Sequence, residues 1–267
     1  MRSSVTWLLG VLAATAVAAV AHADDIRLVN GWVFSATPYF WLPSISGQET
    51  IKGFTADVDT SFSDIFNNTD KHLGFLGNFE AWKDDFGGFV NVNYLNLGQN
   101  NIPTGPTLTN VNYQQTLVDF GLMYRVHAWT LDAVSDPSET PRKIRLDAYL
   151  AGRFTDLYGK LEVQNIALVD STKLWVDPII GGRATTDLTD RLSLLIQADV
   201  GGTSASNDFT WSAAALFGYG FSMWGLESRV QAGYRALSQN WASGSGNRQF
   251  RWNTTLYGPV LGLTIKF

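Results

Sequence analysis

Apolar and polar residues alternate one by one along much of this chain, and this period of two constrains the fold more than any other feature. Between positions 192 and 200, apolar residues at the even positions alternate with Ser193, Gln197 and Asp199. The last ten residues repeat the pattern and end on Phe267. A period of two is typical of strands whose two faces meet different surroundings. Ten strands are predicted, at 32–42, 71–83, 86–98, 111–127, 144–154, 172–186, 192–200, 210–221, 226–235 and 258–267.

The composition favours hydrocarbon as one of the two surroundings. Charged residues make up 16% of the chain, against about 25% in an average soluble domain. Aromatic residues reach 13%, yet no stretch after the first 23 residues approaches the length of an apolar membrane helix. We therefore predict an all-β fold, an antiparallel transmembrane β-barrel of about 10 strands, with eight or twelve strands as alternatives. A secreted β-sandwich is the soluble alternative.

The lengths of the connections agree with a barrel. Asp84-Asp85 and the segments 187–190 and 223–224 are short, whereas loops are predicted at 43–70, 99–110, 159–171 and 239–247. Outer-membrane barrels have short periplasmic turns and longer extracellular loops. The segment 128–142 departs from this rule, because it is long and falls on the periplasmic side.

Residues 1–23 have the layout of a signal peptide. Arg2 is followed by an apolar run, and Ala21-His22-Ala23 forms an A-x-A cleavage site. An N-terminal membrane anchor is the alternative. We expect residues 24–267 to form the barrel in the bacterial outer membrane after export. The chain has no cysteine, and without Arg2 it has 18 basic and 24 acidic residues, which argues against a nucleic-acid partner.

The C-terminal strand carries a resemblance to a protein family. An alternating aromatic strand that ends in Phe267 resembles the closing strand of bacterial outer-membrane barrels. Further motifs are T-P-Y-F-W-L-P (37–43), S-F-S-D-I-F (61–66), W-V-D-P-I-I-G-G-R (175–183), D-L-T-D-R-L-S-L (187–194), A-D-V-G-G (198–202) and G-P-V-L-G-L-T-I-K-F (258–267). With them the chain resembles a family of small proteobacterial outer-membrane β-barrel proteins of undefined function. The resemblance implies that the assembly machinery recognises the Phe267 end, and it implies no substrate.

The predicted inner face carries charges of both signs. By the parity of the strands, the lumen-lining residues are Glu80, Asp119, Arg125, Arg145, Asp147, Arg153, Asp177, Arg183, Asp199, Glu227, Arg229 and Arg235, with Lys266 near the mouth. Unpaired charges in a narrow interior are costly, so we expect them to form ion pairs. They either fill the lumen or line a narrow polar passage, since ten strands are far from the width of an open porin.

The longest predicted loop contains a possible plug. Phe62, Ile65 and Phe66 stand at helical spacing, after serines that could cap a short helix. Such a helix would fold over or into the barrel mouth. An ordinary surface turn is the alternative.

The chain offers little for catalysis. His72 could be combined with Ser61 or Ser63 and Asp64 as a lipid-modifying triad, but no spacing requires it. We expect no enzyme activity, no metal site and no cofactor. Seven tryptophans near strand ends are predicted to anchor the barrel in the membrane interfaces: Trp32, Trp41, Trp82, Trp129, Trp175, Trp224 and Trp241. Carbohydrate stacking at Trp41 and Trp241 is the alternative.

The sequence thus predicts a narrow or plugged channel for small polar solutes, or a structural membrane protein. The alternatives are a lipid-modifying enzyme and a surface protein that binds through its loops. Outer-membrane lipids, lipopolysaccharide and the assembly machinery are the expected partners. Pro38, Pro178 and Pro259 fall within predicted strands, where proline removes a ladder donor, so bulges or rim positions are expected there.

Overall fold

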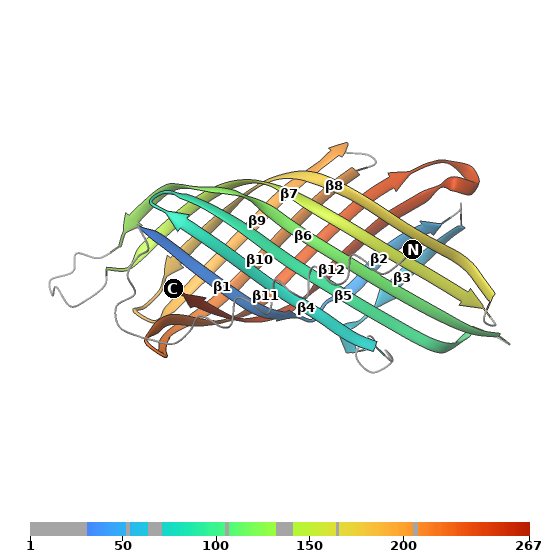
Figure 1. Cartoon of the computed structure of the whole chain (residues 1–267), viewed down its shortest axis with the longest axis horizontal. Coiled ribbons are helices and arrows are strands. Elements are labelled where there is room, and N and C mark those ends of the chain that lie inside the picture. Colours follow the sequence, from blue (N-terminus) through green and yellow to red (C-terminus); the bar gives the residue numbers. More distant parts are fainter. Residues whose placement is uncertain are drawn as a thin grey trace.

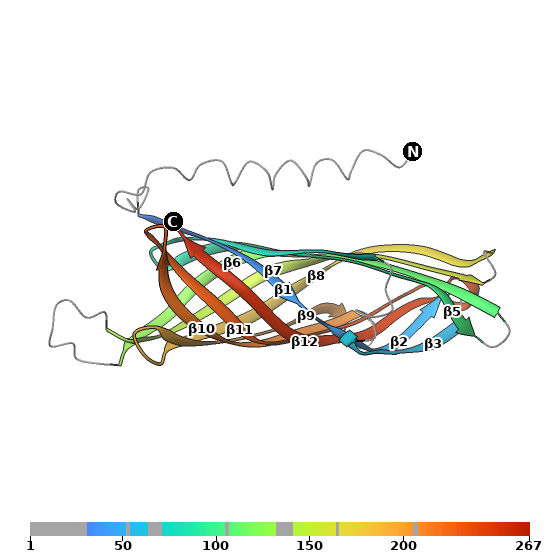
Figure 2. The ribbon, with the colours of Figure 1, turned by 90° about the horizontal axis from the view of Figure 1, so that it is seen from below.

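The computed structural model describes residues 31–51, 54–63, 71–104, 107–131, 141–163, 166–204 and 208–267, which form an elongated antiparallel barrel (Figures 1 and 2). The predicted signal peptide lies outside the described residues. No described helix is long and apolar enough to cross a membrane. The described strands are β1 (Trp32–Trp41), β2 (Ser44–Ile51), β3 (Phe54–Thr60), β4 (Lys71–Lys83), β5 (Phe86–Thr104), β6 (Thr107–Thr130), β7 (Lys143–Val163), β8 (Ile166–Asp187), β9 (Leu192–Ser204), β10 (Asp208–Met223), β11 (Leu226–Ser243) and β12 (Phe250–Lys266).

Ten of these strands close the barrel. Neighbours along the chain from β4 to β12 pair in order, and β1 completes the ring by pairing with both β4 and β12. The prediction of a ten-stranded antiparallel barrel is therefore confirmed. Closure gives every wall strand a partner on both sides, which a sheet in hydrocarbon requires because no water can satisfy an open edge.

The region 43–70 was wrongly predicted to be all loop. After Trp41 the chain continues as β2, which pairs with the N-terminal half of β12, from Phe250 to Tyr257. The strand β3 then pairs with β2, and the two form a hairpin outside the ring. Three other predicted loops are also wrong in part. β5 and β6 extend through most of 99–110, β7 and β8 through most of 159–171, and β11 through half of 239–247, before the short 3-10 helix η1 (Gly246–Arg248). These extensions project beyond the apolar part of the wall, so they lack the alternation on which the prediction relied.

Three tight turns lie at one end of the barrel, which we call the turn end. Asp84-Asp85 joins β4 to β5, the segment 188–191 joins β8 to β9, and Trp224-Gly225 joins β10 to β11. The last two of these turns each lie one residue later than predicted. Trp224 and Gly225 have φ values of 54° and 77°, the left-handed conformation that a tight type I′ hairpin turn requires.

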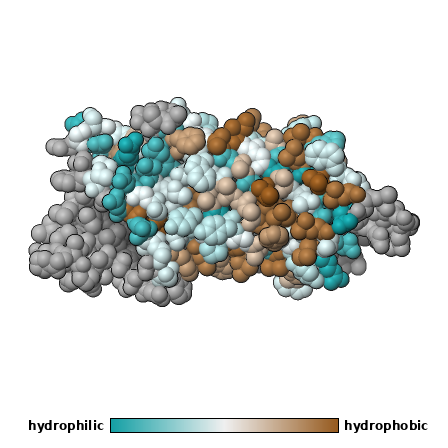
Figure 3. Space-filling model, turned by 180° about the vertical axis from the view of Figure 1, so that it is seen from behind, coloured by the Kyte–Doolittle hydropathy of each residue, from teal (hydrophilic) through white to brown (hydrophobic). Residues whose placement is uncertain are grey.

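The outer face carries the apolar residues of each alternating strand. Phe40 and Leu122 are 69% and 74% exposed, and many further apolar side chains point outward around the ring. Figure 3 shows that the hydrophobic surface extends from the middle of the barrel toward its turn end, whereas the opposite end is more hydrophilic. An apolar outer band with polar extensions beyond it is typical of a membrane barrel.

The three prolines lie neither in bulges nor at the rim, so that interpretation was wrong. β1 and β4 stop pairing at Pro38–Gly77, the β8–β9 ladder stops at Ile179 beside Pro178, and the β1–β12 ladder stops at Val260 beside Pro259. The register shifts of these sheets occur elsewhere. Because each proline stands at the end of a ladder, its missing N–H costs little.

Candidate functional site

A water-accessible cavity of about 1020 Å³ occupies the turn-end half of the barrel. Inward side chains from all ten ring strands line it, and it reaches the turns at Asp84, Thr189 and Gly225. The cavity therefore opens at the turn end. We call it the vestibule.

Of the twelve charged residues predicted to face the lumen, nine line the vestibule: Glu80, Asp119, Arg125, Arg145, Asp147, Arg183, Glu227, Arg229 and Arg235. Arg153, Asp177 and Asp199 do not line it. They lie deeper in the barrel, where each is at most 5% exposed. Lys266 lines the mouth of the vestibule and forms an ion pair with Glu227.

The first of two ion-pair networks lies on β4, β6, β7 and β8. Arg183 contacts Glu80 at 2.7 Å and Asp147 at 3.1 Å, and Arg125 contacts Asp147 at 2.9 Å. The Trp82 indole N–H donates to Glu80, and the Arg125 guanidinium lies 4.6 Å from the centre of the Trp82 ring. Two acids thus balance two bases, and the aromatic ring holds one guanidinium in place.

The second network lies deeper. Arg153 donates to both carboxylate oxygens of Asp119, at 2.8 and 3.2 Å, and forms an ion pair with Asp199 at 3.1 Å. Arg235 lies 3.6 Å from Asp119 and also donates to the Tyr39 hydroxyl oxygen. Two acids again balance two bases, in a geometry that includes a bidentate pair.

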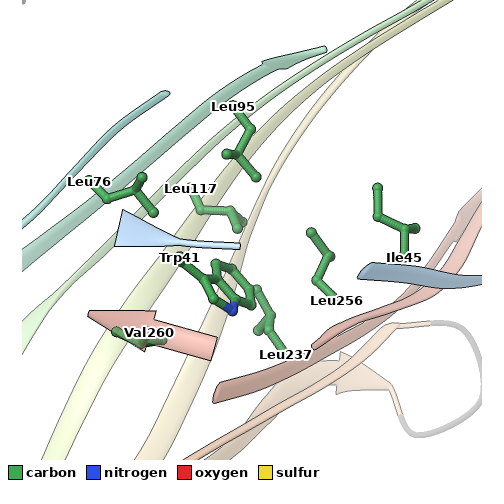
Figure 4. Packing of buried hydrophobic residues seen from close by; sticks show 8 residues of the cluster. All are labelled: Trp41, Ile45, Leu76, Leu95, Leu117, Leu237, Leu256 and Val260. Atoms are coloured by element: carbon green, nitrogen blue, oxygen red, sulfur yellow. The ribbon is translucent and has the colours of Figure 1, made fainter. Parts of the chain in front are cut away.

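An apolar layer closes the lumen beyond the second network (Figure 4). All eight of its side chains are buried: Trp41, Ile45, Leu76, Leu95, Leu117, Leu237, Leu256 and Val260. They come from seven strands and point toward one another across the barrel. This layer was not predicted from the sequence, although the parity of each strand places its residues on the same face as the lumen charges.

A second cluster of buried side chains fills the lumen farther from the turn end, between the extended strands β7, β8, β11 and β12. Leu157, Trp175, Phe250 and Trp252 are buried together, and Trp241 stacks on Trp175 with the ring centres 4.7 Å apart. Between the two layers, Gln239 accepts a hydrogen bond from Gln115 and donates one to Thr155. These side chains pack the described lumen between the vestibule and the long hairpins.

Three of the seven tryptophans predicted to be membrane anchors point outward, and for the other four the prediction was wrong. Trp32, Trp129 and Trp224 are exposed outward, at 38%, 46% and 72%, as membrane anchors would be. Trp41, Trp82, Trp175 and Trp241 instead point inward, where they pack the layers or line the vestibule. Proximity to a strand end misled the prediction, because the parity of a residue along its strand, and not its distance from the strand end, decides which face it lies on.

The predicted plug and the predicted triad fall largely outside the described side chains. Phe62 is described, and its backbone N–H donates to the Ser44 hydroxyl. Ile65, Phe66 and Asp64 lie outside the described residues. The backbone of His72 is paired with Leu97 within β4, but its side chain is not described. Neither hypothesis is tested by this geometry.

No family model matches the chain, and no curated protein sequence matches it. Among solved structures, the chain is similar to the outer-membrane protease OmpT of Escherichia coli, with 9% identity, a TM-score of 0.51 and coverage of 91% of this chain and 99% of that one. A Pseudomonas aeruginosa FadL homologue matches with 9% identity, a TM-score of 0.35 and 90% of each chain covered. The translocator domain of the Neisseria meningitidis autotransporter NalP matches with 11% identity, a TM-score of 0.30 and coverage of 98% and 96%. At these identities the similarity shows the fold alone: the chain has the fold of outer-membrane β-barrel proteins.

Proposed function

We propose that the protein is a plugged outer-membrane barrel whose vestibule opens to the periplasm and takes up small polar solutes. Short turns face the periplasm in such barrels, so the mouth of the vestibule at the turn end opens to the periplasm. In this proposal the chain is exported by its signal peptide, assembled through its C-terminal strand, and surrounded by lipids and lipopolysaccharide. It is not an enzyme.

A single observation supports this function best: a charged cavity of about 1020 Å³ ends at a buried apolar layer. The cavity is as large as the pockets that hold small ligands, which are roughly 300–1000 Å³. Hydrophobic constrictions close pores by excluding water. A solute can therefore enter from the turn end, but it passes farther only if the apolar layer rearranges.

The chain contains no cysteine, so single introduced cysteines can map water access directly. Ser35 lines the vestibule, whereas Gln239 is 1% exposed and lies between the layers. In reconstituted vesicles, Ser35→Cys should react with a water-soluble methanethiosulfonate reagent at least tenfold faster than Gln239→Cys. Adding Leu117→Gly and Leu237→Gly to the Gln239→Cys variant should raise its reactivity and produce a current in planar bilayers. Migration on unheated gels confirms that each variant has folded.

Two results would refute the proposal. If Gln239→Cys reacted as fast as Ser35→Cys without the layer mutations, the barrel would be an open pore. If Ser35→Cys did not react, no solute could reach the vestibule.

A further inference from the structure

We propose that Arg229 is the binding residue of the vestibule, and that its ligand is a small organic acid held through its carboxylate. This inference rests on the proposed function, and it names the class of solute.

The charge balance of the vestibule supports this assignment. Glu80 and Asp147 balance Arg125 and Arg183 in one network, while Asp119 and Asp199 balance Arg153 and Arg235 in the other. Arg229 belongs to neither network. It therefore adds a positive charge to walls that are otherwise neutral.

Arg229 also lacks an acceptor. Among the residues that the structure describes, none forms an ion pair or hydrogen bond with its guanidinium, and its Nε is buried without a partner. A buried donor without an acceptor costs free energy. A carboxylate would supply two acceptor oxygens that match the planar fork of the guanidinium.

The neighbouring strand β10 leaves space for the side chain of Arg229. The inward position Gly218 on β10 has no side chain, and a Cβ there would lie 2.6 Å from the Arg229 Cδ and 2.8 Å from the Ser193 Oγ. The Cγ and Cδ of Arg229 therefore pack over the bare backbone of Gly218, where a side chain would require the arginine stem to move. This packing favours a position of the guanidinium at the wall of the vestibule, which Arg229 lines.

Small residues provide space for the body of a ligand. Gly220 lies opposite Arg229 in the β10–β11 pairing, and a Cβ there would meet only the Arg191 carbonyl oxygen, at 3.5 Å. Gly262 and Thr264 line the same side of the vestibule from β12. In the ring, β11 and β6 are five strands apart in either direction, so the backbone of Arg125 lies across the lumen from that of Arg229, and the Arg125 guanidinium is held on the Trp82 ring. The wall beside Arg229 thus includes small residues, and no described residue pairs with the Arg229 guanidinium.

The test is a titration of the refolded full-length mature chain with 4-fluorobenzoate, followed by ¹⁹F NMR. Wild type should show saturable binding, and Arg229→Gln should weaken it at least about tenfold, the effect expected of losing a charge-assisted hydrogen bond. Arg229→Lys should retain part of the affinity, and Gly220→Val should weaken binding by filling the space. Lys143→Gln, which removes a cation at the vestibule mouth, should change it less than twofold. Inorganic phosphate and the neutral 4-fluorobenzamide serve as competing and negative probes.

Equal affinities for wild type and Arg229→Gln would overturn the inference. Equal losses of affinity in Lys143→Gln and Arg229→Gln would also overturn it, since they would indicate attraction by the overall positive charge at the vestibule mouth. Tighter binding of phosphate or of 4-fluorobenzamide than of 4-fluorobenzoate would overturn it as well. In all these cases the Ser35→Cys reaction still reports whether the vestibule is open, so failure of the ligand assignment is distinguishable from failure of the proposed function.

Discussion

Removing Arg153 should destabilise the barrel more than removing any ion pair at its mouth. The side chain of Arg153 is 1% exposed and donates to Asp119 and to the Thr210 hydroxyl, in addition to its ion pair with Asp199. Arg153→Gln leaves two carboxylates that are only 6% and 5% exposed. Asp119 would keep Arg235 at 3.6 Å, and Asp199 would keep the hydroxyl of Tyr149.

The expected loss follows from this geometry. Breaking one side of a buried ion pair costs about 3–5 kcal/mol, because a charge is left without compensation. Since both carboxylates retain one partner, we expect a loss of about 3 kcal/mol in the free energy of unfolding. With a urea dependence of about 2 kcal/mol per molar, the midpoint should fall by about 1.5 M.

The assay is urea unfolding of the barrel in lipid vesicles, followed by tryptophan fluorescence and by migration on unheated gels. Arg145→Gln is the matched control, because its pair with Asp187 is 23% and 19% exposed and should contribute less than about 1 kcal/mol. Adding Asp119→Asn to Arg153→Gln should recover part of the loss, since it removes one of the two buried carboxylates that lose their ion pair with Arg153. If Arg153→Gln and Arg145→Gln had the same midpoint, the deep network would not stabilise the barrel as argued.

Two further predictions concern the ends of the wall. Glu49 of β2 pairs with Trp252, beyond the membrane-spanning part of β12, and burial raises its pKa from its ordinary 4.5 to about 7. Between these two values the folded state holds a proton that the unfolded chain releases, so the free energy of unfolding should fall as the pH rises from 4.5 to 7. In Glu49→Gln, the urea midpoint should fall less over this pH range. An equal fall in wild type and Glu49→Gln would contradict the prediction. Phe267 pairs with Phe34 through two backbone hydrogen bonds and stacks on its ring at 6.1 Å. Phe267→Ser should lower the amount of folded barrel in cell outer membranes severalfold while refolding in vitro persists, and equal amounts in cells would count against a role in assembly.

The alternation of the sequence carried enough information to predict the wall. It yielded ten strands and the inward position of Glu80 and Arg183. It failed in β2 and β3 and in the long hairpins, because beyond the apolar band the outer face becomes more hydrophilic while the inner face still packs apolar side chains. It also placed Trp41 and Trp175 on the outer face, because both lie near the ends of predicted strands. The parity of each residue along its strand would have placed them on the inner face.

The amino-acid sequence by itself determined which face each strand presents to the membrane, because hydrocarbon on one side imposes a period of two on any strand that crosses it. Only the tertiary structure decided which inward side chains meet. Arg183 pairs with Glu80 across 103 positions of sequence, and the leucines of β4, β5 and β6 meet those of β11 and β12 only after the ring has closed. Those contacts depend on the stagger of all the strands at once, which no local pattern encodes.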